Sequence, residues 1–259
     1  ISKALSPRPD SSITIGIICF CVIASILTAS SSALWSLPTF QGSDLGDRQT
    51  IADSKRAFHQ AFPHVIAPLY RRVSDELLVE LHLLSHQTQF SSTPLFAVGL
   101  EKVFTTFTRG YRPESHPDRL FAAICSSNGF DADALKREAS QTRDAAASAA
   151  MEGITTMLAE QRLPEGSHYS RMMAIGLLTV LETARGNQDS PDGKALAQQA
   201  VDLCTDLNFP SERVEKDLNL FASNSERMEQ AVELMEETLA SDRRKREKRQ
   251  DEAAQGTSS

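Results

Sequence analysis

The chain has 259 residues, and 41% of them are apolar, which is enough to fill the core of one large domain or two small ones. Its 34 acidic and 27 basic side chains give a net charge of -7, so we expect no overall attraction to nucleic acid or to anionic lipid. The four cysteines, two of them in an N-terminal apolar run, do not have the pattern of a disulfide framework or of a zinc site.

The start of the chain is typical of a targeting segment. Basic residues precede an uncharged run at 13–29, which is about as long as a membrane-spanning helix, and Ser31 and Ala33 then fit the small-x-small pattern of a cleavage site. We interpret residues 1–33 as a signal-peptide-like leader and 34–50 as a short transit or linker segment, with a retained membrane anchor as the alternative. The aromatic residue just after the cleavage point resembles those in the bipartite leaders of complex plastids.

Helical segments and chain breakers alternate after this leader, and no stretch shows the sustained alternation typical of strands. Ala, Leu, Glu, Arg and Gln are abundant, which favours helix. Pro68 and Pro94 stand at first-turn positions, and Asp131 or Asp133 can cap the Ala-rich segment that follows them. Helices are expected at 50–62, 65–87, 94–107, 118–127, 131–160, 169–184 and 195–207.

The most regular segment is the last, 211–249, where seam residues recur at alternating spacings of four and three. With Ser211 as its cap, this segment predicts one long helix whose coiled-coil seam is interrupted by Ser225 alone. The seam residues are Val214, Leu218, Phe221, Ser225, Met228, Val232, Met235 and Leu239. The pattern leaves open whether the helix folds back on the rest of the protein or is available to a partner.

These elements together predict an all-α protein. We expect a helical bundle at 51–208 and a long C-terminal coiled-coil-like helix with a basic end at 209–250. The charged and small residues of 251–259 predict a disordered tail.

The segment 73–87 is the strongest candidate for chemistry, because it places carboxylates beside imidazoles. His82 and His86 have the spacing of two metal ligands on one helix, with Glu76 and Glu80 close by in the sequence. The rival hypothesis is therefore a metal-dependent helical enzyme or a metal-binding bundle that uses these four residues. Against it, the Glu that follows the first His of a metalloprotease helix is a leucine here, and the Glu-x-x-His of di-iron bundles is missing. The apolar stripe of the same helix favours core packing.

No other motif indicates catalysis. The sequence has neither the glycine-rich loops that hold phosphates nor the nucleophile elbow of hydrolases. Cys125 lies in an apolar helical stretch, which is typical of a buried thiol. We expect no catalytic residue, cofactor or metal.

Three places carry candidate protein-interaction residues: a charged helix face, a turn, and a run of basic side chains near the end of the chain. For the turn, a salt-bridged connector is the alternative. The basic run is consistent with nucleic-acid contact, attraction to an anionic membrane, or a solvated helix end, and nucleic acid is disfavoured because no aromatic residues are interleaved. The residues are Arg71, Arg72, Tyr111, Arg112, Glu114, Arg243, Arg244, Lys245 and Arg246.

Six segments, in the same order along the chain, resemble the thylakoid formation protein family, also described as a photosystem II biogenesis factor of cyanobacteria and plastids. They cover nearly all of 51–249, and 134–165 matches least well. The segments are DSKRAFHQAFP (53–63), YRRVSDELLVELHLLS (70–85), GYRPE (110–114), LFAAICSSNGFD (120–131), YSRMMAIGLLTVLE (169–182) and the stretch that begins DLNFPSERVEKDLNLF (206–249).

The resemblance implies a non-enzymatic, all-helical protein of the chloroplast stroma or of the stromal face of the thylakoid membrane. It implies support of thylakoid formation and of photosystem II assembly or repair. The partners it implies are the FtsH protease and the photosystem II assembly and repair machinery, with peripheral thylakoid contact and no nucleic acid. It carries over no catalytic residue.

Overall fold

The computed structural model describes residues 49–186 and 193–256, with side chains up to residue 250. The predicted leader and almost all of the predicted linker lie outside these residues. From Gln49 onward the chain forms one compact unit.

The described residues form eight helices and no strand, which confirms the predicted all-α class. Most bounds agree with the sequence prediction to within a few residues. The helices are α1 (Ile51–Ala61), α2 (Pro68–Ser85), α3 (Pro94–Phe107), α4 (His116–Ser126), α5 (Ala132–Ala159), α6 (Arg171–Arg185), α7 (Gly193–Asp202) and α8 (Ser211–Gly256).

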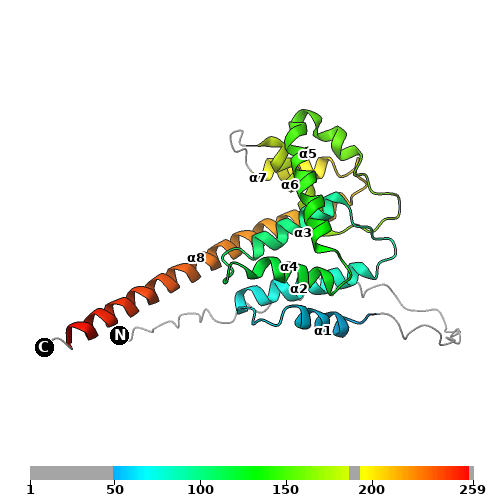
Figure 1. The fold of residues 1–259 in the computed structure, drawn as a ribbon. Helices are drawn as coiled ribbons and strands as arrows, with labels where there is room; N and C mark the ends of the chain where they lie inside the picture. Colours follow the sequence, from blue (N-terminus) through cyan, green and yellow to red (C-terminus); the bar gives the residue numbers. More distant parts are fainter. Residues whose placement is uncertain (1–48, 187–192, 257–259) are drawn as a thin grey trace, which may run out of the picture. The chain divides into compact units, whose positions relative to one another are not determined.

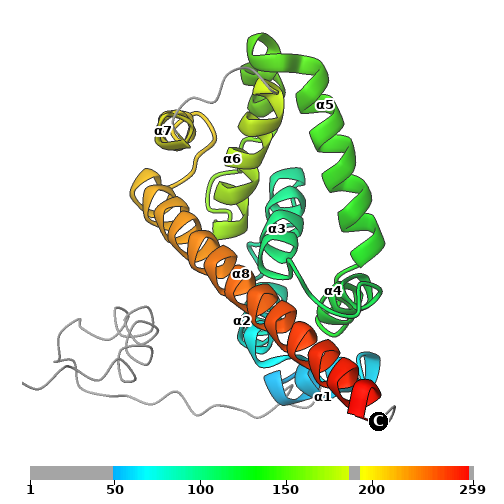
Figure 2. The ribbon, with the colours of Figure 1, turned by 90° about the vertical axis from the view of Figure 1, so that its left-hand side faces the viewer.

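The helices pack in two groups that α8 links at one side (Figure 1). Helices α3, α5 and α6 pack against one another, and α1, α2 and α4 form the second group, which meets the first where α4 contacts α5. Figure 2 shows α8 running as one straight rod from beside α7 and α6 past α3. The core is continuous through both groups, because buried side chains of every helix belong to a single apolar cluster.

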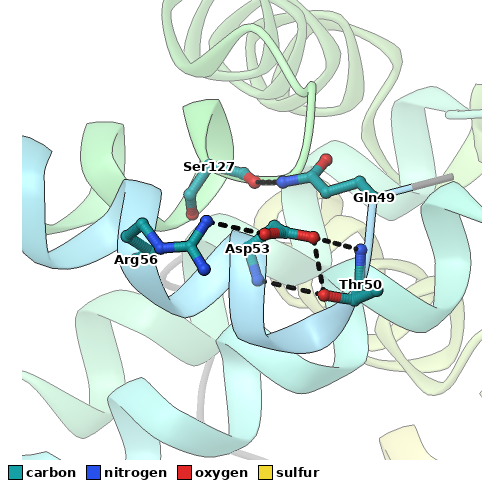
Figure 3. Close-up of polar contacts among 5 residues, drawn as sticks. All are labelled: Gln49, Thr50, Asp53, Arg56 and Ser127. Carbon is teal, nitrogen blue, oxygen red and sulfur yellow. Dashed lines mark hydrogen bonds and ion pairs between the residues drawn. The ribbon is translucent and has the colours of Figure 1, made fainter. Parts of the chain in front are cut away.

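The first helix is held at its start by polar contacts (Figure 3). Thr50 and Asp53 form a capping box: the Asp53 amide donates to Thr50 Oγ1 at 3.3 Å, and the Thr50 amide donates to Asp53 Oδ2 at 3.0 Å. Gln49 Nε2 then donates to the carbonyl of Ser127 at 2.7 Å, just past the end of α4. These bonds satisfy amides that a helix start leaves open, and they fix α1 beside α4.

The crossing of α3 and α6 depends on two glycines. A Cβ atom on Gly99 would lie 1.7 Å from the carbonyl oxygen of Met172, and one on Gly176 would lie 1.8 Å from that of Leu95. Backbone therefore touches backbone at this crossing. A side chain at either position would push the two central helices apart.

Helix α5 departs from the single straight helix that its Ala-rich sequence predicts. Asp131 caps it, since Asp131 Oδ1 accepts from the amides of Asp133 and Ala134 at 3.0 Å each, and this settles the choice between the two predicted caps. Ala150 has φ 48° and ψ -170°, which interrupts the helix and divides it in two. Positive φ is unfavourable for alanine, so local sequence alone would not place a break here.

The last helix differs from the prediction at both ends. It begins at Ser211, and the carbonyl of Pro210 accepts from the amides of Arg213 and Val214 at 2.9 and 3.0 Å, so Pro210 takes the capping position predicted for Ser211. At the other end, α8 continues to Gly256 and thus into the segment 251–259, for which we predicted disorder. The Glu, Ala and Gln residues there are good helix formers, and a long preceding helix lowers the cost of extending it.

Within 49–186 and 193–256, no helix combines the length and the apolar character that a membrane crossing requires.

Candidate protein-interaction site

The helix that carries the imidazoles and carboxylates, α2, buries its apolar stripe as predicted. Leu77, Leu81 and Leu84 are at most 5% exposed, and Leu78 beside them is fully buried. One face of α2 therefore belongs to the core, and most of the polar residues of 73–87 lie on its other faces.

His82 in α2 and His86 just past its end each have one ring nitrogen with a partner. His82 Nδ1 lies 2.9 Å from the Ser54 hydroxyl of α1, and His86 Nδ1 lies 2.8 Å from the carbonyl of His82. Burial, together with His86, lowers the pKa of His82. No three His, Cys, Asp or Glu side chains lie close enough to hold a metal ion anywhere in the described parts of the chain.

The two glutamates of this segment face arginines. Glu76 Oε1 accepts from Arg72 Nε at 2.9 Å on the surface of α2. Glu80 instead forms an ion pair with Arg171 at the start of α6, in which both Nε and Nη2 donate to Oε2. Burial raises the pKa of Glu80, and the neighbouring Arg171 opposes that change. The Glu80 pair thus joins two helices, which is a structural role.

A partly buried polar cluster extends this pair to α8. Tyr169 donates to Asp217 Oδ2 at 2.9 Å, and the guanidinium of Arg213 lies 5.8 Å from the Tyr169 ring centre. Burial raises the pKa of Asp217 and that of Tyr169. The bond from Tyr169, just before α6, to Asp217 therefore links α8 to the bundle.

Sequence reasoning did not identify this cluster. Its members are far apart in the chain, and each is a single polar residue in an amphipathic helix or beside one. The available signal was Arg171 at the start of an otherwise apolar helix, because a charge there needs a partner.

The predicted turn 110–114 holds α8 in place. Tyr111 is only 4% exposed, and its ring centre lies 4.8 Å from that of Tyr70, whose hydroxyl donates to the carbonyl of Arg109 at 3.1 Å. Gly110 has φ +75°, and a Cβ there would lie 2.8 Å from Val232 Cγ1 of α8. Backbone at this turn therefore lies directly against α8.

The charged residues near the turn point to solvent. Arg112 and Glu114 form an exposed ion pair with each other, as the salt-bridged connector predicts. On α2, both Arg71 and Arg72 are exposed, and Arg71 Nη2 reaches the carbonyl of Ile66 at 3.5 Å.

Helix α8 divides into a docked half and an exposed half. Val214, Leu218, Met228 and Val232 are at most 8% exposed, whereas Leu239 is 53% exposed. The predicted seam therefore packs against the bundle up to about Met235. This half of the helix folds back on the rest of the protein, which was one of the two placements that the sequence left open.

The docked half borders a groove of about 1100 Å³ between α3, α6, α7 and α8. Its apolar lining includes Leu178, Val201 and Phe221. The rim carries the ion pair of Lys102 with Glu182, whose nitrogen and oxygen lie 3.2 Å apart.

The basic run lies in the exposed half, beyond Val232, the last buried residue among the described side chains of α8. Residues 242–250 are all exposed, and the Arg244 Nε donates to the carbonyl of Ala240 at 3.3 Å within the helix. The structure thus brings the turn together with α8 near Val232, and it leaves Arg243–Arg246 further along the same helix.

Comparison with known proteins agrees with this fold. The family model described as thylakoid formation protein matches residues 50–250. The protein Thf1 of Synechococcus sp. strain CC9902 is 61% identical over 83% of this chain and 100% of its own length, and Thf1 of Synechococcus elongatus is 39% identical over 76% of this chain and 84% of its own. A solved structure of Psb29 has a TM-score of 0.66 and 31% identity, covering 76% of this chain and 98% of that one.

Proposed function

The chain belongs to the thylakoid formation protein family, and on this premise we propose that it supports thylakoid membrane formation and the assembly or repair of photosystem II by binding other proteins. The FtsH protease is the partner we propose first. The compartment we propose is the plastid, in the stroma or on the stromal face of the thylakoid membrane.

One observation carries this proposal: the similarity to Thf1 covers the whole length of that relative. The matched part is the unit formed by the bundle and α8, so a shared activity would have to come from these helices.

The internal pairing of polar groups favours a binding role over catalysis. In the segment 73–87, the two glutamates meet arginines and the imidazoles meet a hydroxyl and a carbonyl. Burial also raises the pKa of Cys125 to about 12, so its thiol is a poor nucleophile at neutral pH.

The test is a strain that lacks this protein. We expect slower recovery of photosystem II chlorophyll fluorescence after strong light, together with reduced FtsH abundance, and both should return when the gene is restored. Unchanged fluorescence and unchanged FtsH in that strain would contradict the proposal.

Matched variants locate the contact. Replacing both Arg112 and Glu114 by alanine removes an exposed ion pair at the turn, and replacing both Lys102 and Glu182 removes one at the groove. Exposed pairs contribute only about 0 to 1 kcal/mol, so both variants should fold. If the turn is the contact, the first variant alone should lose FtsH in co-purification.

A further inference from the structure

The tip of α8, defined as residues 243–249, is a concentrated positive charge on a negative protein. It carries six basic side chains and one acidic side chain, a net charge of +5. Removing these from the totals of 27 and 34 leaves 21 basic and 33 acidic side chains, a net charge of -12 for the rest of the chain. Every residue of the tip is exposed.

The charges of the tip surround the helix instead of forming one face. Successive residues of an α-helix turn by about 100°, so seven consecutive residues cover its whole circumference. The tip also occupies only about 10 Å of the helix axis, which is close to one Debye length at physiological ionic strength. Basic groups of the tip therefore face a charged surface from whichever side of the helix that surface approaches.

The rigid helix keeps this charge away from the acidic bundle. Among the described side chains of α8, Val232 is the last buried one, and Arg243 lies eleven positions further along, or about 16 Å at the rise of an α-helix. That is about two Debye lengths at physiological salt, so the bundle's negative charge is largely screened at the tip. A flexible tail could fold back onto the acidic surface, whereas a continuous helix cannot.

We propose that the tip of α8 binds the anionic lipid headgroups of a membrane surface. A dense plane of negative headgroups suits charges that point in every direction, whereas an acidic protein would need a defined contact face. The exposed Leu234 and Leu239 are five positions apart, about 140° around the helix, so they do not form an apolar stripe that could insert. Binding is electrostatic and sensitive to salt.

This inference deepens the proposed function, on which it rests, by naming the chemistry that holds the protein beside its membrane. Asp251 and Glu252 follow the tip in the sequence and lower the net charge of 243–252 to +3. Neutralising these two acidic residues raises the net positive charge, which is the opposite of what removing basic residues does.

The experiment measures vesicle binding by sedimentation. It uses the chain from residue 49 onward, which is one compact unit, because the apolar run at 13–29 could bind lipid by itself. Vesicles of equal parts phosphatidylglycerol and phosphatidylcholine are compared with vesicles of phosphatidylcholine alone. We expect binding to the anionic vesicles only, and loss of that binding in high salt.

The loss variant replaces four basic residues of the tip by glutamine, and a matched variant makes four such changes at exposed positions elsewhere. Each basic residue near a bilayer contributes roughly a fivefold increase in partitioning, so the loss variant should bind at least about 100-fold more weakly. The matched variant has the same net charge and should bind anionic vesicles far better than the loss variant. The two sets are R243Q, R244Q, K245Q, R246Q and K55Q, R119Q, R137Q, R227Q.

A third variant, D251N with E252Q, should bind more tightly than the unmodified chain. The proposal is overturned if the loss variant binds the anionic vesicles as the unmodified chain does. It is also overturned if the four substitutions reduce helix content without affecting lipid binding, since the basic residues would then only stabilise the helix end. Purified lipid is the only partner present in this experiment. Its failure would therefore not decide the outcome of the test in the deletion strain.

Discussion

Replacing Gly99 by alanine tests the contact that sets the spacing of the two central helices. The new methyl group would lie 1.7 Å from the Met172 carbonyl oxygen, whereas ordinary contact begins at 3.4 Å. The oxygen belongs to the backbone of α6 and cannot rotate away. Helices α3 and α6 would have to separate by up to about 1.7 Å, the difference between these two distances.

The cost follows from the space that this separation opens. The crossing is about 10 Å wide in each direction, so separating the helices by that amount opens a space between them. If relaxation of the neighbouring side chains refills half of this space, a cavity of roughly 85 Å³ remains. At about 24 cal/mol per Å³ the cavity costs roughly 2 kcal/mol, and overpacking strain adds about 1 to 3 kcal/mol. The better helix propensity of alanine returns only about 1 kcal/mol. We expect Gly99→Ala to lower the free energy of unfolding by about 3 kcal/mol.

Urea unfolding followed by circular dichroism measures this change, and a melting curve should shift downward by about 6 to 12 °C. Gly153→Ala in α5 is the matched control, because its Cβ would meet only the Ala149 methyl group at 3.3 Å. That control should leave stability unchanged or raise it by up to about 1 kcal/mol. Gly176→Ala should resemble Gly99→Ala, and the double variant should cost less than the sum, since both open the same crossing. A Gly99→Ala protein as stable as the unmodified one would refute this reasoning.

Three other predictions concern charge, thiols and the last helix. Burial raises the pKa of Asp217 in the folded state, so its ionisation destabilises the fold at neutral pH. Asp217→Asn should therefore be at least as stable as the unmodified protein at pH 7. Paired urea titrations should show the stability difference between the two proteins vanishing as the pH falls through the raised pKa to below 3.8. Burial raises the thiol pKa of Cys125 to about 12 and that of Cys204 to about 11. In a chain whose other two cysteines are replaced by serine, a thiol reagent should therefore react only after unfolding, and rapid labelling of the native protein would contradict this. Deleting residues 241–259 should leave the melting temperature nearly unchanged, because the described side chains at 242–250 are all exposed. Val214→Asp, by contrast, should lower the unfolding free energy by more than about 3 kcal/mol by burying a charge, and similar melting temperatures for the two variants would show that the docked half contributes little.

Local patterns were sufficient for most helix bounds. The prolines in the first turns of α2 and α3, the Asp131 cap and the spacing of apolar residues act over a few residues, so the chain order alone reveals them. The break at Ala150 could not be foreseen, because nothing in an alanine-rich stretch favours positive φ.

The candidate site divides in the same way. The basic run and the seam of α8 are periodic or continuous features, and both could be read directly. The ion pair of Glu80 with Arg171 and the bond from Tyr169 to Asp217 join residues 91 and 48 positions apart, and no spacing rule connects such residues.

The sequence by itself determined that this protein is helical, where its helices begin, and that its last helix has one apolar seam and a basic end. These properties follow from propensity, capping and periodicity, which are local. Only the tertiary structure decided that the seam lies on the bundle as far as Met235 and that the tip extends beyond it. That choice depends on the shape of the surface offered by α3, α6 and α7, including the backbone at Gly110, and a one-dimensional pattern does not contain that shape.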